Sequence, residues 1–85
     1  KFPCIKLAYD AIQKGGSYPV VLNIANDEAV ELFLQDKIKF INIPEIIELS
    51  MKEHLYISNP NLNDIKDISE QTKKFVHSLI EKGRI

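Results

Sequence analysis

The 85-residue chain has no tryptophan, only one cysteine and only three glycines. A lone cysteine, Cys4, cannot form a disulfide within the chain, and no histidine lies near it in sequence. We therefore interpret Cys4 as a buried, reduced thiol rather than a nucleophile. The chain also lacks a glycine-rich phosphate loop, a CxxC pair and an HExxH motif. The sequence therefore carries none of the common signatures of disulfide scaffolds, nucleotide-binding loops and zinc proteases.

An excess of charge of one sign is also missing, since 11 basic residues nearly balance 12 acidic ones and the net charge is −1. The chain therefore lacks the clustered basic face by which proteins bind the phosphates of nucleic acids. No apolar run approaches the roughly 20 residues of a membrane span, and the N-terminus lacks the order of a signal peptide. We expect a soluble domain that binds neither nucleic acid nor membrane.

Size and composition indicate one globular unit. Hydrophobic residues make up 45% of the chain and charged residues 27%, a balance typical of folded proteins. Residues 1–85 are near the lower end of the size at which one core suffices. The first residue is Lys1 rather than Met, and an apolar pattern begins almost at once. We therefore expect a single domain that is a piece of a longer chain.

Apolar residues recur at helical spacing along most of the chain. They predict a small, all-α, four-helix bundle-like domain with helices near residues 3–15, 18–36, 43–55 and 63–82. Pro3, Pro19 and Pro44 suit first turns, where a missing N–H is no loss. Residues 37–45 alternate apolar and polar, but they have no partner strand, so we expect an extended connector there. Residues 56–63, rich in Asn, Ser and Pro, predict a loop.

Polar residues near the helix ends predict caps. We expect Ser17 to cap the second helix and Asn63 or Asp64 to cap the fourth. His54 is expected to cap the C-terminal end of the third helix, where the helix dipole favours a positive charge. Gly83 is expected to end the fourth helix. The first half of the second helix is apolar on nearly all sides, which predicts a central helix contacted from several directions.

Two asparagines, Asn23 and Asn26, lie three residues apart on the second helix, so their amides project from one side of it. We interpret both as structural, bonding a neighbouring helix end, a loop or an adjoining domain. Two alternatives remain open. Asn26 would be a cap if the helix began late, and either amide could contact a ligand.

The acidic and histidine residues do not form a recognisable reactive site. Asp27, Glu28 and Glu31 point to different sides of a helix with no histidine near, so we interpret them as a solvated face. His77 has no cysteine, aspartate or second histidine at ligand spacing, which argues against a metal role. We therefore expect no catalytic, cofactor-binding or metal-binding residue in this chain.

The string FPCIKLAYDAIQKGGSYPVVLNIANDEAVELFL, followed by KIKFINIPEII, closely resembles the start of one known helical domain. That domain is the C-terminal domain of 1-deoxy-D-xylulose 5-phosphate reductoisomerase, whose members carry a pattern like YPCLKLAYEA, a glycine pair, PAVLNAANEEAV and F-x-DI. The resemblance is strong from Phe2 to about Glu48, and beyond it only the general layout agrees. Two departures, Ile24 for a small residue and Asn42 for aspartate, are tolerable for packing.

The resemblance implies a role within a larger enzyme. Members of the family use NADPH and Mg²⁺ or Mn²⁺ to convert 1-deoxy-D-xylulose 5-phosphate to 2-C-methyl-D-erythritol 4-phosphate, a step of the non-mevalonate isoprenoid pathway. An upstream domain binds NADPH, and a central domain supplies the metal ligands. None of those motifs occurs in residues 1–85, so no site residue is carried over onto this chain. The resemblance thus implies a structural C-terminal domain whose partners are the upstream domains and a second copy of the parent.

Two other functions and the cellular compartment stay open at this point. A free-standing helical protein-interaction module is the main alternative. An acyl-carrier protein would need Asp-Ser-Leu at the start of its second helix, and the nearest string is ELSM at residues 48–51. The family works in bacterial cytoplasm and in plastid-derived organelles. The abundance of isoleucine, lysine and asparagine suits an apicoplast-type organelle as well as several bacteria.

Overall fold

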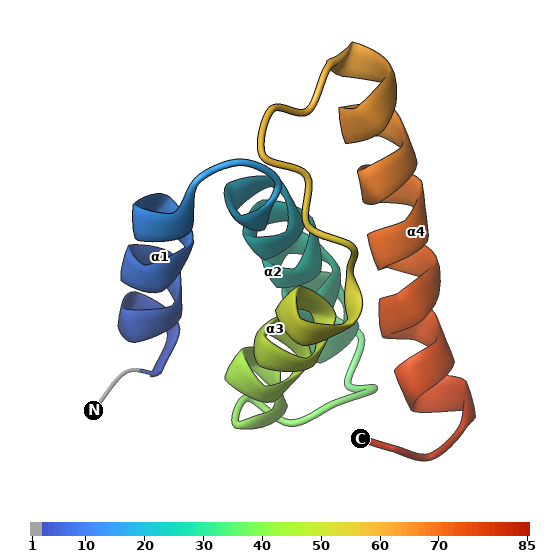
Figure 1. Ribbon diagram of the computed structural model, residues 1–85. Helices are drawn as coiled ribbons and strands as arrows, with labels where there is room; N and C mark the ends of the chain where they lie inside the picture. Colours follow the sequence, from blue (N-terminus) through green and yellow to red (C-terminus); the bar gives the residue numbers. More distant parts are fainter. Residues whose placement is uncertain (1–2) are drawn as a thin grey trace.

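A computed structural model describes residues 3–85 of the chain, with side chains from Lys6 onward (Figure 1). It contains four helices and, in that range, no strand; their bounds are α1 Pro3–Lys14, α2 Tyr18–Leu34, α3 Asn42–Glu53 and α4 Leu62–Glu81. The all-α class is confirmed, and every helix end falls within two residues of its predicted position. The side chain of Cys4 lies outside the described part, so its buried thiol stays a prediction.

Helix α2 is the centre of the domain. It packs against α1, α3 and α4, as its nearly all-round apolar first half predicts (Figure 1). Val21, Ala25 and Ala29 lie one turn apart on its core face and are fully buried. Alanines on this face let neighbouring helices approach closely. Although α2 is strongly apolar, no helix of the described chain has both the length and the apolarity that crossing a membrane requires.

Helices α3 and α4 supply most of the remaining core. Their buried apolar side chains recur at helical spacing and are Ile43, Ile46, Ile47, Met51, Ile68, Val76 and Leu79. The predicted apolar faces of both helices are therefore confirmed, with one exception. Leu55 continues the helical spacing of Ile47 and Met51 in the sequence, which predicts that it faces the core. It is instead 87% exposed, because α3 ends at Glu53 and the chain turns away from the core there.

The segment between α2 and α3 is a series of turns, so the predicted extended connector is wrong. Asp36, with φ of +60°, reverses the chain directly after α2. The Lys37 N–H then donates to the Leu32 carbonyl oxygen at 2.9 Å. Ile38 is 9% exposed and anchors the segment to the core. The alternating pattern arises from one buried residue in a turn rather than from the two faces of a strand.

The start of α4 differs from the prediction, whereas its end agrees. Asn61, not Asn63 or Asp64, is the cap. Its side-chain oxygen accepts from the Asp64 N–H at 2.8 Å, and the Asp64 carboxylate accepts from the Asn61 N–H at 3.1 Å. Asp64 is thus the reciprocal partner in a capping box, three residues into the helix. Gly83, with φ of +70°, follows the end of α4 as predicted.

Candidate functional site

A network of hydrogen bonds joins the turn between α1 and α2 to the segment after α3. The Ser17 N–H donates to the Ile57 carbonyl oxygen at 2.9 Å, and the Ile57 N–H donates to Ser17 Oγ at 2.9 Å. Ser17 Oγ also lies 3.0 Å from Nε2 of His54. Ser17 stands at the predicted cap position of α2, but its hydroxyl makes no capping bond. The predicted capping bond of Ser17 is therefore wrong, because its hydroxyl bonds His54 and Ile57 in the segment after α3 instead.

His54 completes this network and caps α3, as predicted. Its Nδ1 lies 2.8 Å from the Met51 carbonyl oxygen, one of the last carbonyls of the helix. Because a carbonyl oxygen can only accept, Nδ1 carries the hydrogen. In the neutral ring, Nε2 then accepts from the Ser17 hydroxyl, while that hydroxyl accepts from the Ile57 N–H. Every polar group of the network therefore has a partner.

Close packing surrounds the network. The ring of Tyr18 lies 4.9 Å from that of His54, edge to face, and 5.0 Å from that of Tyr56. The Tyr56 hydroxyl donates to the last carbonyl of α1 at 3.2 Å. Gly16 has φ of +59°, and a Cβ there would lie 2.5 Å from the Ile57 carbonyl oxygen. Only glycine suits this close approach. We call the group formed by Gly16, Ser17, Tyr18, His54, Tyr56 and Ile57 the serine–histidine junction.

A serine hydroxyl beside a histidine nitrogen is also the geometry of a nucleophile and its base. The surroundings argue against such a role. Ser17 is 0% exposed, so a substrate cannot reach its Oγ. The other nitrogen of His54 is held by a backbone carbonyl rather than by a carboxylate. The junction therefore serves the fold. Sequence reasoning missed it because 37 residues separate Ser17 from His54 and no local pattern links them.

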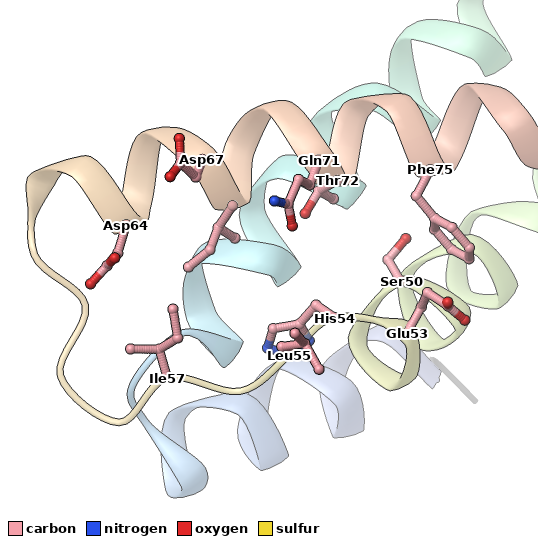
Figure 2. Close-up of a pocket in the computed structure, with 11 residues that line it drawn as sticks. Ser50, Glu53, His54, Leu55, Ile57, Asp64, Asp67, Gln71, Thr72 and Phe75 are labelled. Carbon is pink, nitrogen blue, oxygen red and sulfur yellow. The ribbon is translucent and has the colours of Figure 1, made fainter.

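A cleft of about 370 Å³ lies between the end of α3, the following segment and α4 (Figure 2). Its lining has no lysine or arginine but three carboxylates, those of Glu53, Asp64 and Asp67. Ser50 lines it at 2% exposure, and its Oγ has no hydrogen-bond partner in the described part of the chain. Figure 2 shows this side chain directed toward α4. The α3–α4 cleft is thus lined by acidic side chains, and the unpaired Ser50 hydroxyl lies buried beside it.

The acidic run on α2 is a solvated face only in part. Asp27 and Glu31 are exposed, as predicted. Glu28 is less exposed, and its Oε1 lies 2.9 Å from Nε2 of His77 on α4.

The described residues contain no group of three metal-ligating side chains, the α3–α4 cleft included. They also lack the strand and glycine turn that hold a dinucleotide.

Asn23 and Asn26 are both exposed, and neither amide bonds to another side chain or loop in the range that the structure describes. The expectation that they bond loops of this domain is wrong. Residues are about 100° apart around a helix, so Asn23 lies about 200° from the buried Val21, on the outer side. Because α2 begins at Tyr18, Asn26 is not its cap either.

Comparisons with known proteins agree on one family. A family model described as the DXP reductoisomerase C-terminal domain matches residues 1–75. A 1-deoxy-D-xylulose 5-phosphate reductoisomerase from Geobacillus sp. (strain WCH70) is 45% identical over 80 residues, which cover 94% of this chain and 21% of the relative. The enzyme of that name from Chloroherpeton thalassium is 51% identical over 77 residues, covering 91% and 20%. No solved structure matches the chain.

Fold and site together define a small helical domain whose buried polar contacts serve packing. The chain belongs to the DXP reductoisomerase C-terminal domain family, which confirms the resemblance seen in its sequence. It spans about a fifth of the length of the curated relatives it matches, and the relatives named above are bacterial.

Proposed function

We propose that residues 1–85 are the C-terminal helical domain of a 1-deoxy-D-xylulose 5-phosphate reductoisomerase. The parent enzyme converts that substrate to 2-C-methyl-D-erythritol 4-phosphate in the non-mevalonate isoprenoid pathway. The single observation that carries the proposal is the family match over residues 1–75. Relatives about five times as long as this chain support further domains in the same polypeptide, with the NADPH-binding and catalytic domains upstream.

The role of this domain within the enzyme is structural. The reaction needs a hydride from NADPH and a divalent cation, Mg²⁺ or Mn²⁺, to hold the substrate oxygens during the rearrangement. The proposal is supported by the described residues, among which no three metal-ligating side chains gather and no strand leads into a glycine turn. We therefore assign the cofactor, metal and catalytic residues to the other domains. This domain contributes packing and a surface on which those domains rest.

Asn23 and Asn26 mark the surface that we assign to this contact. Each amide has both donors and an acceptor, so two amides one turn apart suit an irregular backbone segment of an adjoining domain. Both are exposed on the outer side of α2, the helix that contacts every other helix of the domain. A domain docked there would be held by the most central element of this fold.

The proposal also covers assembly and location. We take the parent to be a homodimer, as the family resemblance implies. The bacterial relatives support a bacterial cytoplasm. A plastid-derived organelle has only the abundance of isoleucine, lysine and asparagine in its favour.

The direct test is NADPH consumption by the full-length chain with 1-deoxy-D-xylulose 5-phosphate and Mn²⁺, with and without residues 1–85. We expect turnover by the full-length chain and, on truncation, a loss of turnover that parallels a loss of folded protein. No turnover by a well-folded full-length chain would contradict the proposal. It would favour a helical interaction module instead.

A further inference from the structure

We propose that the outer side of α2 is a docking surface for a segment of the same polypeptide that lies outside these 85 residues. The segment bonds the amides of one half of the surface and packs apolar side chains on the other half. The inference rests on the proposed function, because it deepens the contact assigned to Asn23 and Asn26 and needs the longer chain.

The surface begins at the two asparagines and continues to the end of α2. At about 100° per residue, the apolar residues that share this side lie within roughly 80° of Asn23 around the helix axis. Leu34 is 71% exposed, and Val30 and Phe33 are half-buried. The ring of Phe40, in the turn after α2, lies 5.6 Å from that of Phe33 and is 67% exposed. We call Asn23, Asn26, Val30, Phe33, Leu34 and Phe40 the α2 stripe.

The α2 stripe carries no charge, and Asp27 and Glu31 border it on one side only. The exposed side of α4 is different, since it is mostly charged and includes Lys66, Asp67, Glu70, Lys73 and Lys74. The other helices pack on the remaining sides of α2, with α1 and α4 flanking it and α3 in front in Figure 1. A helix with so little charge around it is typical of one covered from every direction. The α2 stripe is the side that this domain leaves open.

The size of the α2 stripe favours a segment of the same polypeptide over a second copy of the domain. A helix rises about 17 Å from Asn23 to Leu34 and is about 10 Å wide, which gives a face of roughly 170 Å². Two separate proteins that associate stably bury about 800 Å² each. A contact within one chain needs less, because the covalent link raises the effective concentration of the partner surface. Since the chain spans about a fifth of its relatives, most of the polypeptide lies outside it and can supply this segment.

The two halves of the α2 stripe define the chemistry of the segment. Asn23 and Asn26 are exposed, and each amide offers two donors and an acceptor, which suit backbone groups that no helix or sheet uses. Leu34 and Phe40 keep most of their apolar surface in water, which burial against another apolar side chain would remove. We therefore assign to the segment an irregular backbone that carries aliphatic or aromatic side chains.

The first test measures how fast a thiol on the α2 stripe reacts with iodoacetamide in the folded full-length chain. The stripe variant is Leu34→Cys, and the matched control is Ile12→Cys on α1. Leu34 and Ile12 are 71% and 70% exposed in this domain, and each lies in the last turn of its helix. Each rate is divided by the rate of the same variant in denaturant, and mass spectrometry of the labelled peptides separates these thiols from native cysteines.

We expect this ratio to be roughly tenfold lower for Leu34→Cys than for Ile12→Cys, because a thiol under a docked segment reacts only when the contact opens. Equal ratios would overturn the inference.

The second test identifies the occupant by Phe40→benzoylphenylalanine in the full-length chain. This side chain keeps an aromatic ring at the site and, on irradiation, bonds to whatever lies against it. We expect a product with the mass of one chain, crosslinked to a peptide outside residues 1–85. A product of twice that mass, linked to residues 1–85 of a second copy, would overturn the assigned occupant. A crosslink confined to this domain would overturn the docking surface itself.

Failure of this inference is distinguishable from failure of the proposed function. Both tests read the accessibility of the α2 stripe, whereas NADPH consumption is measured on the wild-type full-length chain. Normal turnover with equal labelling ratios would refute the docking surface and leave the parent enzyme in place. No turnover by a well-folded full-length chain would refute the parent enzyme.

Discussion

Ser17 and Ser50 are both buried serines, but only the hydroxyl of Ser17 forms hydrogen bonds in the described chain. Ser17 is 0% exposed, and its hydroxyl bonds both the Ile57 N–H and the ring of His54. Ser50 is 2% exposed, and its hydroxyl has no partner in the described chain. The Ser17 hydroxyl is therefore fully paired within this domain, whereas the Ser50 hydroxyl is unpaired in the described range.

The difference follows from what surrounds each hydroxyl. Ser17 faces the segment after α3, where the backbone groups of Ile57 are not used by any helix and are free to pair with it. Ser50 faces α4, whose backbone groups already bond along the helix. Only side chains could pair with Ser50 from that direction. A buried polar group between two helices thus depends on side chains, and here none within the described range reaches it.

Gly16→Ala should cause the largest loss of stability. It tests how closely Gly16 approaches the Ile57 carbonyl oxygen. The new Cβ would lie 2.5 Å from the Ile57 carbonyl oxygen at φ of +59°, so we expect the free energy of unfolding to fall by about 3 kcal/mol. Gly15→Ala is the control, since at φ of +66° its Cβ meets no atom within 4 Å. It should cost about 1 kcal/mol. Equal losses in denaturant unfolding would contradict the close approach.

Ser17→Ala should cost about 2 kcal/mol, because it leaves the Ile57 N–H and Nε2 of His54 without partners in a buried site. Denaturant unfolding monitored by circular dichroism measures this loss. Ser58→Ala is the control, since Ser58 is exposed in the same loop, and it should change stability by less than about 0.5 kcal/mol. A loss as small as that of the control would mean that the junction does not stabilise the fold.

Ser50→Ala in the 85-residue chain should have the opposite sign to Ser17→Ala. It removes a buried hydroxyl that has no partner, so we expect stability to stay unchanged or to rise by up to about 1 kcal/mol. The same unfolding measurement applies. A clear loss in the short chain would show that Ser50 is bonded within this domain, and the contrast between the two serines would disappear.

Asn23→Ala should have the smallest effect on the 85-residue chain, within about 0.5 kcal/mol, because the amide is exposed. In the full-length chain, Asn23→Ala/Asn26→Ala should lower the unfolding midpoint if this face contacts another domain. Asn59→Ala, an exposed amide in the loop before α4, serves as the control. A clear loss in the short chain would contradict the exposure of Asn23.

Local patterns predicted the helices and most of the core, because helix formation and burial of one face depend on neighbours three and four residues away. The same reasoning was wrong for Asn23 and Asn26. Bonds to loops of this domain were expected, but such bonds depend on which side of α2 faces the other helices. It was also wrong for Leu55, since the pattern continues past the point where the chain leaves the helix at Glu53.

By itself, the sequence of this protein determined the all-α class, the helix bounds to within two residues and the family, since all three are recorded in short-range spacing and in strings such as VLNIANDEAV. Only the tertiary structure decided that Ser17 pairs with His54 and Ile57, that Gly16 cannot accept a side chain, and that Ser50 lies buried beside an acidic cleft. The contacts of Gly16 and Ser17 join residues about 40 positions apart, whose proximity arises only when the helices pack.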